Sequence, residues 1–177
     1  MIDCDRSALI SDCGTYRYRL DRLTIAHDVT GKTAAFIMVN PSTADAVVDD
    51  PTIRKVEGFV IRNGAGRFVV GNLFAFRATD IKALRTAAYP VGPENDRHLE
   101  QIMRDADLHI VAWGPLAKLP PHLRDRWREV VAIADQVGCR LMCLTAAQDG
   151  HPRHPLMLSY STPLVAWSIP GGAHAQG

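Results

Sequence analysis

The chain has 177 residues, a formal net charge of +1 and 22% charged residues, values typical of a soluble globular protein of one domain. This balance excludes a chain-wide polycationic surface for nucleic acid, although it is compatible with a local basic patch. No apolar run approaches the about 18 residues of a membrane span, and no signal-peptide pattern opens the chain. We therefore expect a cytoplasmic protein without a membrane partner.

The first expected element is a β-hairpin over residues 7–24. Asp12-Cys13-Gly14 supplies its turn, and Tyr16, Tyr18 and Leu20 alternate with two arginines. Period-two alternation is typical of an antiparallel edge strand that has one face in water.

From residue 33 onward, apolar strands alternate with amphipathic helices. The strands are expected at residues 33–39, 67–71, 108–113 and 139–144. A first helix is expected between Asp50-Pro51 and Asn63-Gly64, and others near 80–87, at 93–106 and at about 121–137, the last ended by Gly138. This order predicts a three-layer α/β/α fold with a central, mainly parallel four-stranded sheet plus the N-terminal hairpin.

The remaining features complete a single α/β domain over residues 1–170. A polar loop at 146–155 leads to a last short strand at 164–167, and residues 171–177 are expected to be a disordered tail. The four cysteines, Cys4, Cys13, Cys139 and Cys143, contain no C-x-x-C pair. We expect reduced thiols, no metal site and no cofactor.

Polar, turn-forming residues directly follow the expected strands. Asn40-Pro41-Ser42 follows the first strand, Asn72 the second, and Trp113-Gly114 ends the third. Ligands of an open parallel sheet bind beyond the carboxyl ends of its strands. The sequence therefore predicts a pocket at this edge, with the Trp113-Gly114 turn contributing to its shape.

Each strand-end asparagine has a functional and a structural interpretation. Asn40 can orient a water or bind a polar edge, or it can serve a turn together with Pro41 and Ser42. Asn72 can pair with an amide or a base edge, or it can cap its strand.

The segment after Asn72 carries two aromatic and two charged candidates. Phe74 and Phe76 can stack on a planar ligand, or pack in the core. Arg77 and Asp80 can contact a ligand, or pair with each other.

Three carboxylates and a histidine-rich loop complete the candidates. Asp45, Asp49 and Asp50 can bind a hard cation or supply a general base, although Asp50 also suits a helix N-cap. His151-Pro152-Arg153-His154-Pro155 lies in a loop after the fourth strand. Its histidines offer a proton near neutral pH, and its arginine offers a forked donor to phosphate or carboxylate.

Three segments, in order, resemble motifs of the uracil-DNA glycosylase superfamily. Val39-Asn40-Pro41-Ser42 resembles the first motif of the mismatch-specific and single-strand-selective branches, in which the asparagine lies beside the attacking water; Ser42 stands where that motif has glycine. Val69-Val70-Gly71-Asn72 resembles the strand whose terminal asparagine reads the base. The segment from Ile110 to Lys118 is similar to the third-strand segment of the superfamily, which ends in tryptophan-glycine.

His154-Pro155, or less closely His151-Pro152, resembles the histidine-proline-serine loop of the same superfamily. That loop inserts at the DNA and supports the departing base. A closer likeness runs nearly end to end: the strings NPSTAD, DDPTIR, NLFAFRATD, GPEND and PRHPL together resemble an uncharacterised bacterial and phage domain family that brings no established activity.

The first resemblance implies a glycosylase-like hydrolase acting on the N-glycosidic bond of a nucleobase. The substrate would be a free nucleoside or nucleotide, or single-stranded or flipped DNA. The resemblance implies Asn40 for the water and His154 for the leaving base anion as catalytic residues, and Asp45 is a third catalytic candidate as a general base. The implied substrate-binding residues are Pro41, Ser42, Asn72, Phe74, Arg77, Trp113, Arg153 and His151. Two other classes stay open: a non-catalytic nucleotide or nucleic-acid binding module, and a cation-dependent phosphate-ester enzyme using Asp45, Asp49 and Asp50.

Overall fold

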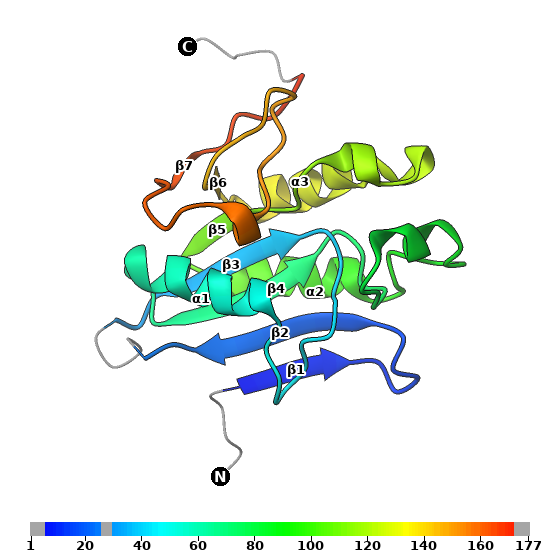
Figure 1. The fold of residues 1–177 in the computed structure, drawn as a ribbon, viewed down its shortest axis with the longest axis horizontal. Coiled ribbons are helices and arrows are strands. Elements are labelled where there is room, and N and C mark those ends of the chain that lie inside the picture. The colour runs from blue at the N-terminus through cyan, green and yellow to red at the C-terminus, as the bar shows by residue number, and fades with distance from the viewer. Residues whose placement is uncertain (1–5, 26–29, 172–177) are drawn as a thin grey trace.

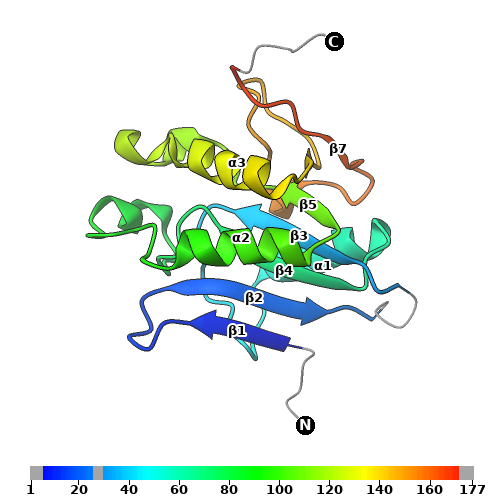
Figure 2. The same ribbon diagram turned by 180° about the vertical axis from the view of Figure 1, so that it is seen from behind.

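The structure is a computed structural model that describes residues 6–25 and 30–171. Its strands are β1 (Arg6–Ile10), β2 (Arg17–Leu23), β3 (Thr33–Met38), β4 (Arg67–Asn72), β5 (Leu108–Val111), β6 (Leu141–Cys143) and β7 (Val165–Ala166). The α-helices within these residues are α1 (Pro51–Arg62), α2 (Asn95–Asp105) and α3 (Arg126–Val137). The strands form one sheet in the order β1-β2-β4-β3-β5-β6-β7. Helix α1 covers one face (Figure 1), and α2 and α3 cover the other (Figure 2).

The sheet corrects the expected fold class. The prediction of a central, mainly parallel four-stranded sheet is wrong, because the described residues form a seven-stranded mixed sheet. Antiparallel pairings join β1 to β2, β2 to β4 and β6 to β7, whereas β4, β3, β5 and β6 pair in parallel. Strand β2 extends the sheet by placing Leu20 opposite Val70. Period-two alternation indicates an antiparallel strand but does not identify its partner, so the pattern does not predict that β2 pairs with β4.

Helix boundaries follow local capping chemistry. Helix α1 begins after Asp50, whose Oδ1 accepts a hydrogen bond from the N–H of Ile53 at 2.9 Å. Helix α3 ends at Gly138, which adopts a left-handed φ of 81°. The expected start of α3 near residue 121 is wrong: Pro121–Leu123 forms a separate 3₁₀ turn, and α3 begins at Arg126.

One further expected helix has a different form in the structure, and two expected features lie outside the described residues. The expected helix near 80–87 is a 3₁₀ turn over Ile81–Arg85. Cys4 and residues 172–177 of the expected tail lie outside the described residues.

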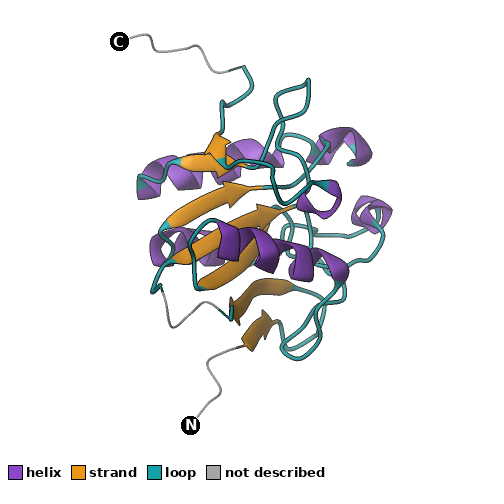
Figure 3. Ribbon diagram, turned by 60° about the vertical axis from the view of Figure 1, so that its left-hand side comes forward, coloured by secondary structure: helices purple, strands orange, loops and turns teal. Residues whose placement is uncertain are grey.

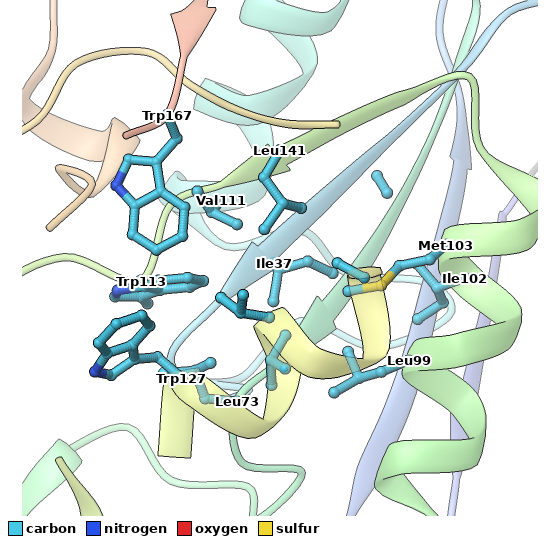
Figure 4. Packing of buried hydrophobic residues seen from close by; sticks show 14 of the residues in the cluster. Ile37, Leu73, Leu99, Ile102, Met103, Val111, Trp113, Trp127, Leu141 and Trp167 are labelled. Atoms are coloured by element: carbon cyan, nitrogen blue, oxygen red, sulfur yellow. The ribbon is translucent and has the colours of Figure 1, made fainter. Parts of the chain in front are cut away.

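The core consists of two apolar clusters, one on each face of the sheet. Phe36 packs beneath α1 with Phe59 and Phe68, whereas its neighbour Ile37 belongs to the cluster beneath α2 and α3 (Figure 4). Successive strand residues point to opposite faces, so these continuous apolar runs serve both clusters. Burial of each such side chain contributes about 1.5–3 kcal/mol, and it holds the strand ends in fixed positions.

A bulge in β2 determines where Arg17 lies. Leu9 pairs with Arg19 and Ile10 with Arg17, so Tyr18 is the extra residue on β2. Tyr18 stacks on His98 of α2 at a centroid distance of 4.9 Å. Arg17 is only 2% exposed, and its Nη1 donates to the carbonyl of Ala44 at 2.6 Å. The bulge thus buries an arginine that a regular edge strand would present to water.

Candidate functional site

The candidate site lies beyond the carboxyl ends of the parallel strands. The strand order reverses at β3, which has β4 on one side and β5 on the other, and such a reversal is where open α/β sheets bind ligands. In Figure 3 the arrowheads of the central strands point toward the side where many of the loops gather. A cavity of about 460 Å³ lies at this position.

Loops that follow all four parallel strands line this cavity. Its polar lining includes Asn40 and Ser42 after β3, Thr79 and Asp80 after β4, Lys118 after β5, and His154 after β6. Asp50 at the start of α1 and Arg17 of β2 complete the wall. A larger hollow of about 570 Å³ lies at the opposite strand ends, beside His109 and Gly138. We favour the smaller cavity because polar groups from every parallel strand meet there.

Asn40 is held by the loop that follows β4. Its Nδ2 donates to the carbonyl of Ala78 at 2.8 Å and to that of Pro41 at 3.1 Å. These bonds use both amide hydrogens, and no described residue donates to Asn40 Oδ1. The amide oxygen is therefore an oriented acceptor available to a water or a ligand.

His154 lies in the cavity wall as an oriented neutral imidazole. Its Nδ1 accepts a hydrogen bond from the N–H of Leu156 at 3.3 Å, so the proton of the neutral ring is on Nε2. Burial lowers the pKa of His154 below its ordinary value, although Asp50 partly opposes this effect. Within the described part of the chain Nε2 has no partner, and it can donate to a ligand.

Arg17 is a site residue that the sequence analysis missed. Its guanidinium offers five N–H donors, yet among the described residues only the Ala44 carbonyl accepts a hydrogen bond from it, and Nε is buried without a partner. Burial lowers the pKa of Arg17 to about 10, against the opposing effect of nearby Asp50. No sequence signal marked this residue, because a bulge is not visible in a period-two pattern.

Asn72, Phe74 and Trp113 lie in the protein interior and do not line the cavity. Asn72 pairs in register with Met38, which does line it, but the Asn72 side chain is buried, and neither of its amide atoms has a hydrogen-bond partner in the described part. Phe74 and Trp113 belong to the cluster beneath α2 and α3, where Trp113 meets Trp167 edge-on at 5.1 Å (Figure 4). Phe74 and Trp113 are therefore explained by core packing, without contact to a ligand.

The three aspartates of the loop after β3 have separate partners. Asp45 Oδ1 accepts hydrogen bonds from the N–H groups of Val47 and Val48, both at 2.8 Å, and these bonds lower the pKa of Asp45. Asp49 pairs with two arginines, and Asp50 caps α1. Within residues 6–25 and 30–171, no group of three or more His, Cys, Asp or Glu side chains is placed to hold a metal ion. Of the three carboxylates, Asp50 lines the cavity.

The other basic candidates lie around the cavity at different distances. Arg77 borders an adjoining hollow of about 370 Å³, which shares Ser42, Ala78 and Thr79 with the main cavity. Arg153 is exposed and does not line the cavity. His151 packs edge-on against Trp127 at 5.2 Å, so the structure brings His154, and not His151, to the same cavity as Asn40.

Comparison with known proteins identifies a family and no function. A family model described as a protein of unknown function, DUF1643, matches residues 17–156. No curated protein and no solved structure matches the chain. The matched span runs from Arg17 to just beyond His154, so it includes the whole cavity lining. None of the described helices is both long and apolar enough to cross a membrane.

Proposed function

This chain belongs to the DUF1643 family, and we propose that it hydrolyses the N-glycosidic bond of a nucleobase-containing substrate. One observation carries the proposal: Asn40 and His154 line the same cavity. Each has one oriented side-chain atom without a protein partner in the described part, an acceptor on Asn40 and a donor on His154. A hydrolytic site for this bond needs both.

The proposed chemistry divides between these two side chains. Asn40 Oδ1 accepts a hydrogen bond from a water and so orients it toward the anomeric carbon. The water oxygen bonds to that carbon as the C–N bond breaks, and the base leaves with the bonding electron pair. His154 Nε2–H donates to the base as negative charge develops, and the proton lost by the water ends on the base. A donor of this kind is worth about 10²–10³ in kcat.

The motif resemblance supports the reaction class at two positions. Asn40-Pro41 and His154-Pro155 resemble the water-positioning and leaving-group motifs of the uracil-DNA glycosylase superfamily. The proposal assigns no base-reading role to Asn72, because that side chain is buried outside the cavity. Ser42 and Thr79, which line the cavity, offer hydroxyl groups for contacts with the substrate.

Release of free base is the direct test. Purified protein is incubated with nucleosides, nucleoside monophosphates, and single- and double-stranded oligonucleotides containing normal and deaminated bases, with and without a chelator. Chromatography with mass detection should find free base from one of these classes, at a rate the chelator does not change. Phosphate release that the chelator abolishes would instead indicate phosphate-ester chemistry.

A binding module is the second candidate, and one observation favours it. An amide cannot take up a proton, so the residue at position 40 cannot be the base that activates the water. A ligand-induced rise in Tm, with no free base from any substrate class, would support binding alone.

A further inference from the structure

We infer that the part of the cavity lined by Arg17 is a subsite for the terminal phosphate of a nucleotide, with Arg17 as its main ligand. The nucleobase part of this ligand rests on the proposed function. The phosphate part rests on an independent observation, the unpaired buried arginine.

Three arginines are buried in the described part of the chain, and Arg17 differs from the other two. Arg22 pairs with Asp49 at 2.8 Å, and Arg126 pairs with Asp96 and Glu129. Arg17 is as buried as Arg22, yet no described carboxylate lies within ion-pair distance of it, and its Nε has no acceptor. A buried charge without a counter-charge is strongly unfavourable. Such a group is retained where a ligand supplies the missing anion.

The other polar groups of the cavity that Arg17 lines fit a phosphate group. Ser42 and Thr79 offer hydroxyl groups, and Lys118 offers an ammonium group, from three different loops around the cavity. A guanidinium binds phosphate oxygens through two parallel hydrogen bonds. The described cavity therefore presents enough donors for the three oxygens of a phosphate monoester.

Two carboxylates share the cavity wall, and the backbone offsets part of their charge. Asp50 Oδ1 accepts a hydrogen bond from the N–H of Ile53, and Asp80 Oδ1 accepts one from the N–H of Lys82, both at 2.9 Å. Each caps the helical turn that follows it. Arg17 donates to one backbone carbonyl, that of Ala44, and its Nε has no acceptor in the described part of the chain.

The depth of Arg17 favours a terminal group over a polymer phosphate. Its guanidinium is almost fully buried, and a phosphodiester in a strand must continue out of the site on both sides. A terminal phosphate can enter with its oxygens foremost. A free nucleotide therefore fits this cavity better than a nucleotide within a DNA strand.

Calorimetric titration of the full chain tests this subsite without requiring turnover. The titrants are a nucleoside 5′-monophosphate, the parent nucleoside, inorganic phosphate, and a single-stranded oligonucleotide without a terminal phosphate. We expect the monophosphate to bind at least about tenfold more tightly than the nucleoside or the oligonucleotide, and inorganic phosphate to compete with it.

Substitutions at two arginines locate the subsite. Arg17→Met replaces the buried charge with an apolar side chain of similar volume, a change that is often neutral or stabilising for the fold. It should weaken monophosphate binding about tenfold or more and leave nucleoside binding unchanged. Arg153→Met removes an exposed arginine of the His154 loop and should change neither. If Arg17→Met does not fold, Arg17→Lys serves as the second variant. It keeps the positive charge but lacks the planar guanidinium that binds two phosphate oxygens at once, so it should bind the monophosphate with reduced affinity.

Several outcomes would overturn the inference. These are wild-type affinity in the Arg17 variants, equal binding of nucleoside and monophosphate, tighter binding of the oligonucleotide, or binding of inorganic phosphate alone. Base release from unphosphorylated or polymeric substrates would leave the proposed function standing and refute the subsite. Arg17-dependent nucleotide binding without base release would support the subsite and refute the proposed function.

Discussion

Gly114 packs directly against His154. Gly114 has a φ of +77°, and a Cβ at this position would lie 3.2 Å from the Cβ of His154. The N–H of Gly114 also donates to the carbonyl of Pro152 at 3.1 Å. The turn after β5 thereby holds the loop after β6 in place. The position of the imidazole depends on a glycine in a different loop.

Replacing Gly114 with alanine should impair catalysis more than stability. Backbone strain at positive φ costs about 1–2 kcal/mol, and the new methyl group should displace His154. The contact requires a shift of a few tenths of an ångström, so we expect kcat to fall by less than the 10²-fold that a misplacement of about 1 Å can cost. Gly138→Ala is the matched control, because Gly138 has a φ of +81° and nothing within 4 Å of the added Cβ. Both variants should lower Tm similarly, and equal kcat values for the two would contradict the proposed role of His154.

The stability of the protein should fall on acidification through the titration of His154. Burial lowers the pKa of folded His154 below about 6.5, its ordinary value. Below about pH 6.5 the unfolded chain binds a proton at His154 that the folded chain does not bind. The free energy of unfolding therefore decreases as the pH falls toward the pKa of folded His154, and above about pH 6.5 this decrease does not occur. Thermal melting at pH 7.5, 6.5 and 5.5 should show a smaller pH dependence for His154→Gln than for the wild type. The remaining dependence is expected from His98 and His151, whose pKa values burial also lowers. An unchanged pH dependence in the variant would show that His154 titrates normally.

Cys13 should be the most reactive of the cysteines that the structure describes. Hydrogen bonds from Ser11 and Thr15 lower the pKa of this exposed thiol to about 7, whereas burial raises the pKa values of Cys139 and Cys143. The thiolate is the nucleophile, so a substantial fraction of Cys13 is reactive at neutral pH. Brief treatment with iodoacetamide at pH 7, followed by peptide mass spectrometry, should label Cys13 first. Cys13→Ser should remove this fast phase, and equal labelling of Cys143 would contradict the assignment.

The sequence anticipated those parts of the fold and site that depend on local chemistry. Asp50 and Gly138 mark helix ends because capping is decided within a few residues. The rule that ligands bind beyond parallel strands led to Asn40 and His154, which the structure brings to one cavity. Neither step needed knowledge of distant contacts.

The remaining features depend on contacts that no local pattern contains. Asn72 and Asn40 both follow apolar strands, yet only Asn40 reaches the cavity, because Asn72 is the last residue within its strand and is buried beside Met38. Arg17 was read as part of a regular alternation, and a single bulge turned it inward. The seven-stranded mixed sheet similarly depends on which strand β2 pairs with.

The central claim is that Asn40 orients the water that attacks the N-glycosidic bond. Its most direct test is the rate of base release by Asn40→Ala on a substrate from which the wild-type protein releases base. Asn63→Ala is the matched control, because Asn63 also donates from Nδ2 to a backbone carbonyl, that of Phe59 at 2.9 Å, and lies outside the cavity lining. We predict that Asn40→Ala loses base release by about 10² or more while it still folds and binds nucleotide, and that Asn63→Ala retains it. Base release by Asn40→Ala at the wild-type rate would contradict the account.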